Sequence, residues 1–128
     1  MNKLIIPEVL VATGMVADAA AGIPKQALFH DATGEWPDAR VGLQSVTMPP
    51  GSANQFHRHP GEQWTAVQEG EVTFTIKGQP PQVLKAGDHN HVPRGTIHRQ
   101  QNLSDKPARY IEMMILDKGR PASEAMVE

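Results

Sequence analysis

The sequence predicts an all-β domain. Eleven glycines and eleven prolines in 128 residues are many for a helical protein, and they separate short apolar or alternating runs. The run VTFTI alternates strictly, which puts Val72, Phe74 and Ile76 on the core face of a strand. About ten such strands, punctuated by Gly or Pro every eight to twelve residues, are typical of a β-sandwich or jelly roll.

The strands are expected in the following order. The first segment, 4–11, contains Pro7 and is expected to form one or two edge strands, because proline cannot donate to a sheet ladder. The Ala- and Gly-rich stretch 12–24 fits either a short helical turn or a loop. Further strands are expected at 25–30, 41–48, 55–59, 63–69, 71–77, 82–85, 88–92, 98–102 and 109–116. The tail from residue 117 is expected to be exposed and mobile.

Length and composition restrict the kind of protein that this chain can be. One domain is expected over 1–128, because this length is typical of a single domain. The formal net charge is −2 with no long run of one sign, which argues against nucleic acid or a membrane as partner. The N-terminal apolar run is shorter than a signal-peptide core or a membrane span, so a cytoplasmic protein is expected. Because the chain has no cysteine, any metal site must use histidine, carboxylate and amide ligands.

The segment HRHPGEQ, residues 57–63, contains the residue types of a metal site. Alternate side chains of an extended strand lie on one face, so His57 and His59 point the same way. Parity also places Gln63 on their face and Glu62 on the other, although the Pro-Gly pair between them leaves a shift in register open. We therefore prefer Gln63 to Glu62 as a further ligand.

Two linked spacing patterns include this segment. The first, at 51–70, consists of Gly51, His57, His59, Gln63 and Gly70. The second, at 87–102, consists of Gly87, Pro93, Gly95, His98 and Asn102. Together they resemble the two motifs of the cupin superfamily, whose usual form has glutamate where this chain has Gln63. The resemblance implies a single-domain jelly-roll barrel, in which residues 1–30 form an N-terminal arm or edge strands.

The resemblance also implies a divalent metal ion held by His57, His59, Gln63 and His98. Imidazole nitrogen and amide oxygen suit Mn, Fe, Co, Ni or Zn, whereas three imidazoles would be an unusual set for calcium or magnesium. Four protein ligands on an octahedral ion leave two positions for water or substrate, as in a catalytic site.

Three other residues are candidates for acid–base catalysis near such an ion. Tyr110 and Glu112 share one face of the last long strand, where a cupin barrel can present them to its cavity; alternatively, this face points to solvent or to a dimer partner. His89 and His91 share a face close to the second motif. His91 is the candidate for a proton donor beside the ligands, and an ordinary surface position is its alternative.

The neutral amide at position 63 indicates the type of reaction. Without a carboxylate ligand the ion keeps its full charge, which strengthens Lewis acidity and disfavours Fe(III). We therefore expect a non-redox lyase, isomerase or cyclase-type enzyme that acts on a small oxygenated substrate. The alternatives are an Fe(II)-dependent dioxygenase and a binding or sensor protein without turnover. Since cupins often pair through sheet faces or exchanged N-terminal strands, a homodimer is also expected.

Overall fold

The computed structural model describes residues 16–18, 23–32 and 36–126, and all regular structure in these residues is β. Their strands are β1 (Val16–Asp18), β2 (Ile23–Ala32), β3 (Ala39–Met48), β4 (His57–Arg58), β5 (Gly61–Glu69), β6 (Glu71–Ile76), β7 (Gln82–Lys85), β8 (His89–Val92), β9 (His98–Gln101), β10 (Ala108–Asp117) and β11 (Glu124–Ala125). This part of the chain contains no helix that could span a membrane.

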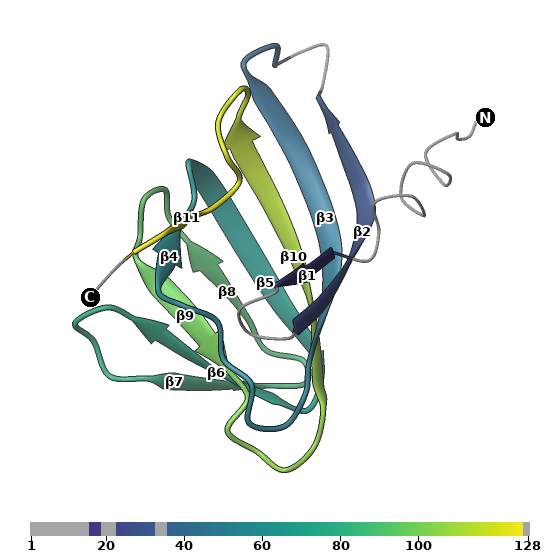
Figure 1. Cartoon of the computed structure of the whole chain (residues 1–128), viewed down its shortest axis with the longest axis vertical. Helices are drawn as coiled ribbons and strands as arrows, with labels where there is room; N and C mark the ends of the chain where they lie inside the picture. The colour runs from purple at the N-terminus through teal and green to yellow at the C-terminus, as the bar shows by residue number, and fades with distance from the viewer. Residues whose placement is uncertain (1–15, 19–22, 33–35, 127–128) are drawn as a thin grey trace.

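The strands form two antiparallel sheets that face each other (Figure 1). The larger sheet has the order β1-β2-β3-β10-β5-β8, and the smaller has the order β11-β4-β9-β6-β7. Successive strands such as β5 and β6 change sheet at a turn and do not pair with each other. Among the described residues the sheets are therefore not closed into the barrel that the sequence predicts, although the jelly-roll arrangement is present.

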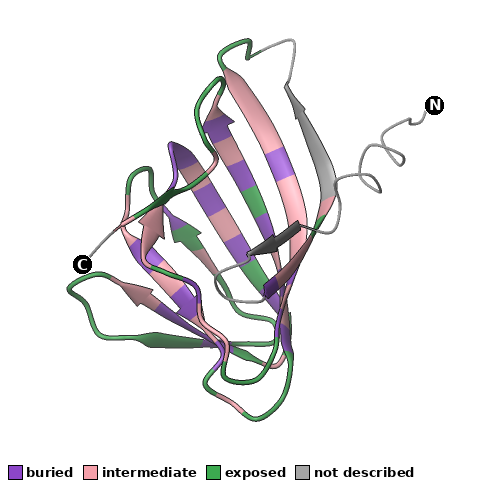
Figure 2. Ribbon diagram, viewed as in Figure 1, coloured by how far each residue is buried: buried purple, intermediate pink, exposed green. Residues whose placement is uncertain are grey.

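The hydrophobic core lies between the two sheets. Along β10 the even-numbered side chains from Ala108 to Leu116 are all buried (Figure 2). From the smaller sheet, Val72 and Phe74 are buried and Ile76 packs against them, as the alternation of VTFTI predicts. Burying each large apolar side chain stabilises the fold by roughly 1.5–3 kcal/mol.

The predicted strands from residue 25 to residue 116 agree with the observed ones within two residues at each end. The predicted edge strands at 4–11 lie outside the described residues. Within 12–24, the described residues belong to β1 and to the start of β2. The tail is largely exposed, as predicted, and its end is also paired: β11 pairs with β4, and the Met126 N–H donates to the carbonyl oxygen of Phe56 at 2.8 Å. This pairing satisfies an edge of the smaller sheet that would otherwise be open.

Candidate metal centre

Three histidines from neighbouring strands lie together. His57 stands directly opposite His98 in the β4–β9 pairing, and their ring centroids are 4.4 Å apart. His59 follows β4. One ring nitrogen from each residue lies within 4.8 Å of the other two. The two predicted motifs therefore bring their histidines into one group that can hold a metal ion.

All three rings use Nδ1 for a hydrogen bond to a backbone carbonyl oxygen. The pairs are His57 with Gln55 (2.7 Å), His59 with Ala122 (2.7 Å) and His98 with Thr96 (2.8 Å). A carbonyl oxygen only accepts, so Nδ1 of each ring carries the proton and donates it. In each neutral ring the lone pair of Nε2 is then available to a metal ion.

Burial favours the neutral, metal-binding form of these rings. His98 is completely buried, and burial together with the nearby His57 lowers the pKa of His98 to about 3. Burial likewise lowers the pKa of His57. The Nε2 atoms of His59 and His98 are buried without a hydrogen-bond partner. Such atoms are costly to leave unsatisfied, and a divalent ion bound to these nitrogens would satisfy them.

Gln63 lies on the inner face of β5 and is completely buried. Its Nε2 donates to Thr65 Oγ1 at 2.9 Å, and its Oε1 is buried without a hydrogen-bond partner. Its cross-strand neighbour Met114 lines the same cavity as His57. An unpartnered amide oxygen in this position suits a fourth ligand, and the assignment of Gln63 as that ligand stays a prediction.

Glu62 lies on the outer face of β5. Its carboxylate accepts hydrogen bonds from His91 Nε2 at 2.5 Å and from the Arg94 backbone N–H at 3.0 Å, and these bonds lower the pKa of Glu62. The His91 ring also stacks on Trp64, with centroids 5.0 Å apart and planes inclined by 18°. Gln63 is thus the inward residue and Glu62 the outward one, as the sequence predicts, although β4 and β5 belong to different sheets. His91 is exposed on the outer face, so the structure does not bring it beside the three histidines.

A cavity of about 400 Å³ opens beside His57 and His59. Glu112 lines it and is only 4% exposed. Gln44 Nε2 donates to Glu112 Oε1 at 2.5 Å, and Lys25 lines the same cavity. The cavity therefore combines a buried carboxylate, an amide that holds one of its oxygens, and a cation.

Of the two candidates on β10, the structure places Glu112 in this cavity and Tyr110 elsewhere. Both point to the interior, and neither points to solvent. Tyr110 is buried in the hydrophobic core, where it packs with residues such as Phe74. Strand parity predicts the shared face correctly, but it cannot predict which residues along that face meet an open space.

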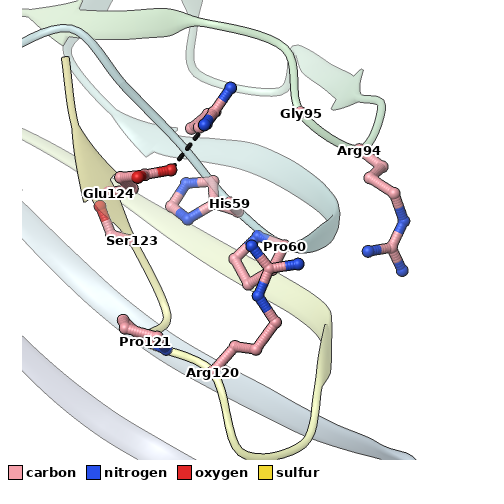
Figure 3. A pocket seen from close by; sticks show the side chains of 9 residues that line it. His59, Pro60, Arg94, Gly95, Arg120, Pro121, Ser123 and Glu124 are labelled. Atoms are coloured by element: carbon pink, nitrogen blue, oxygen red, sulfur yellow. Dashed lines mark hydrogen bonds and ion pairs between the residues drawn. The ribbon is translucent and has the colours of Figure 1, made fainter.

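A second cavity, of about 380 Å³, also reaches His59 (Figure 3). Three arginines contribute to its lining: Arg58, Arg94 and Arg120. Arg58 donates to Glu124 at 2.8 Å, and Arg94 makes two hydrogen bonds to Asp117 at 2.8 and 2.9 Å. Arg120 lies 3.6 Å from the same Asp117, so two carboxylates, Asp117 and Glu124, compensate the three arginines only in part.

Sequence reasoning missed three contributors to the site, namely Lys25, Gln44 and the backbone of Ala122. Gln44 has the parity of the buried Val46 and Met48 in β3, so a polar residue on an apolar face could have signalled it. Lys25 reaches the site because the pairing of β2 with β3 places it opposite Val46. Ala122 contributes only a carbonyl oxygen, and no side-chain pattern indicates that.

The cupin domain model matches residues 44–114. This chain belongs to the cupin family. The match covers more than half of the chain and includes His57, His59, Gln63 and His98. The usual glutamate of the first cupin motif is replaced here by a buried glutamine.

Two solved cupins illustrate the shared fold. A cupin-like protein from Thermotoga maritima superposes with a TM-score of 0.74 at 21% identity, over 88% of this chain and 83% of that one. Oxalate decarboxylase OxdC from Bacillus subtilis, a protein with Mn(II) centres, superposes with a TM-score of 0.69 at 21% identity, over 91% of this chain and 31% of that one. At these identities the likeness shows the fold alone.

Dimethylsulfoniopropionate lyase DddQ from Ruegeria pomeroyi is similar in sequence as well. It is 39% identical over 62 residues, which are 48% of this cupin and 30% of DddQ. The structure of DddQ superposes with a TM-score of 0.67 at 25% identity, over 97% of this chain and 59% of that one. The matched sequence therefore spans less than a third of this relative.

Proposed function

We propose that this cupin is a metal-dependent lyase that acts on a small carboxylate by removing a proton from the carbon next to the carboxyl group. The observation that carries the proposal is the position of Glu112, a buried carboxylate in the cavity that opens beside His57 and His59. The similarity to a lyase, DddQ, supports the same class of reaction.

The residues around the cavity have distinct roles in this proposal. His57, His59, His98 and Gln63 would hold a divalent ion, whose Lewis acidity would stabilise negative charge on an oxygen of the substrate. Gln44 holds one oxygen of Glu112, which leaves the other oxygen to accept the proton. Lys25 supplies a positive charge that suits the carboxylate group of the substrate.

The elimination balances without a further reactant. Glu112 takes the proton, and the electrons of the broken C–H bond form a carbon–carbon double bond. The leaving group departs from the neighbouring carbon with its bonding pair. The products are an unsaturated carboxylate and the released group, and the proton passes from Glu112 to solvent or to that group. No oxidant takes part, which agrees with a neutral amide at position 63.

The Glu112→Gln variant tests the proposal. A panel of small carboxylates with a leaving group on the β-carbon, including dimethylsulfoniopropionate, is supplied to the protein loaded with Mn²⁺, and alkene formation is followed by NMR. We expect the variant to keep its metal and to lose about 10²- to 10⁴-fold in turnover, the usual contribution of a general base. Glu71→Gln, an exposed carboxylate on β6, is the matched control and should remain fully active.

Two results would contradict the lyase. Substrate-dependent oxygen consumption with Fe(II) and no alkene would indicate a dioxygenase. Tight binding of a carboxylate without any product, in the unmodified protein, would indicate a binding or sensor protein.

A further inference from the structure

The geometry points to residues 119–126, here called the C-terminal strap, as a working part of the metal centre. We infer that the strap fixes the ring of His59 and thereby determines how tightly the centre holds its ion. Ala122 is the positioning residue, through its carbonyl oxygen. The inference rests on the metal dependence within the proposed function, but it does not depend on the lyase reaction.

The three histidines obtain their orienting hydrogen bonds in different ways. His57 and His98 each donate to the carbonyl of the residue two positions earlier, so the backbone just before their strands fixes those rings. His59 donates to Ala122, which lies 63 residues further along the chain. Local backbone therefore orients two of the rings, whereas the third depends on the C-terminal strap being in place.

Several contacts hold the strap on both sides of Ala122. On one side, Arg40 Nη2 donates to the Arg120 carbonyl oxygen at 3.0 Å. On the other side, β11 pairs with β4, with Glu124 opposite Arg58 and Ala125 opposite His57. The side chains of Arg58 and Glu124 are joined at 2.8 Å (Figure 3). The Met126 N–H adds a bond to Phe56.

These contacts are few and exposed. The side chains of the Arg58–Glu124 pair are 43% and 56% exposed, and such surface pairs contribute little to stability. Strand β11 is only two residues long. The strap can therefore detach while the two sheets stay folded. Ser123 lines both cavities, so detachment would also join them next to His59.

Metal binding and docking of the strap are thus linked. A docked strap holds His59 Nδ1–H and keeps Nε2 available to the ion. An ion bound to Nε2 keeps the ring in the orientation that the Ala122 carbonyl requires. By reciprocity, each event strengthens the other by the same factor.

The experiment uses full-length variants that release the strap without touching a histidine. Met126→Pro removes the N–H that bonds to Phe56, and Glu124→Arg replaces attraction to Arg58 by repulsion. Mn²⁺ affinity is measured by calorimetry, and the tautomer of His59 is read from its ring ¹⁵N shifts. We expect the double variant to bind Mn²⁺ about 10- to 100-fold more weakly, as loss of an orienting partner usually does, and His59 to populate both tautomers.

Controls separate this effect from general damage. Met126→Ala keeps the N–H and should bind Mn²⁺ like the unmodified protein. Arg58→Glu combined with Glu124→Arg restores the ion pair and should recover the affinity that Glu124→Arg alone loses. Unchanged affinity and an unchanged His59 tautomer in the folded double variant would overturn the inference. Failure of the unmodified protein to bind any divalent ion would overturn it together with the metal centre, whereas bound metal without turnover would overturn only the lyase.

Discussion

His57 and His98 face each other as a cross-strand pair, and each ring donates its Nδ1–H to the carbonyl oxygen of the residue two positions earlier. This pair joins the two sequence motifs at one point. Local backbone thus orients each ring so that it presents Nε2, and the loss of either ring removes one of the three histidines of the site.

We therefore expect the His98→Ala variant to lose its metal ion. In the unmodified protein, Mn²⁺ at about 100 times its Kd should stabilise the fold by about 2.7 kcal/mol, which is visible as a rise in melting temperature. In His98→Ala that rise should disappear. His89→Ala, a change on the outer face of β8, is the control and should keep the rise. An equal rise in His98→Ala would show that Mn²⁺ binds elsewhere.

The second prediction compares neighbours in HRHPGEQ. Gln63→Ala removes the buried amide whose Oε1 has no partner, and it should weaken Mn²⁺ binding by at least tenfold. Glu62→Ala removes a carboxylate on the outer face and should leave Mn²⁺ affinity nearly unchanged. Calorimetric titration of both variants decides between them. A larger loss for Glu62→Ala would mean that a carboxylate completes the site.

Gln63→Glu provides a complementary test. A carboxylate oxygen can replace the amide oxygen, so this variant should retain its metal. The added negative charge lowers the Lewis acidity of the ion, so lyase turnover should fall. A rise in turnover would show that the lyase reaction does not need a neutral amide at position 63.

The third prediction concerns the acid stability of the metal-free protein. Burial lowers the pKa of His57 and, to about 3, that of His98. Below pH 6.5 the unfolded chain therefore binds protons at both positions more readily than the folded chain does, for His98 down to about pH 3, so the free energy of unfolding falls as pH falls. The slope is up to about 1.4 kcal/mol per pH unit for each histidine.

Urea unfolding between pH 7 and pH 5 measures this slope in a range where carboxylates contribute little. His98→Gln removes one of the two groups and should flatten the dependence. His89→Gln, an exposed position, should leave it unchanged. A steeper slope in His98→Gln would show that the folded protein carries His98 in its charged form.

The fourth prediction concerns Gly61. A Cβ added there would lie 1.9 Å from the carbonyl oxygen of Ile115, a backbone atom of the neighbouring strand that cannot move aside. We expect Gly61→Ala to lower the free energy of unfolding by about 3 kcal/mol or more. Gly87→Ala is the control, since its φ of +95° is strained but nothing lies within 4 Å of the added atom, and it should cost about 1 kcal/mol. Equal urea midpoints for the two variants would contradict the close approach of Gly61 to the Ile115 carbonyl.

Strand parity explains why much of the fold and the histidine group could be predicted. The two-residue repeat is a property of the extended backbone, so it places Glu62 and Gln63 on opposite faces of β5. His57 and His59, two residues apart, also join one group, although His59 lies beyond the end of β4. Gln63 is buried and Glu62 is half-buried on the outer face, which follows that pattern.

Which residues of a strand face meet a cavity, and which distant segments pair, could not be predicted in the same way. Parity places Tyr110 with Glu112, but only the packing of the two sheets determines that Tyr110 is in the core while Glu112 meets a cavity. His91 shares a strand with the buried Val92, and the inward direction of Val92 sends His91 outward. The open sheets and the docked strap depend on contacts between distant segments, which local periodicity does not contain.

The stack of Trp64 on His91 gives the protein a built-in optical reporter. Trp64 directly follows Gln63 in β5, so the indole and the amide project from opposite sides of one strand. A movement of the Gln63 side chain acts on the backbone that also carries Trp64. The fluorescence emission of an indole depends on its surroundings. The other tryptophan of the chain, Trp36, lies outside the strands and is 55% exposed. Trp36→Phe would leave Trp64 as the only tryptophan, and the filling of the centre could then be followed by its fluorescence in the protein itself, without any attached dye.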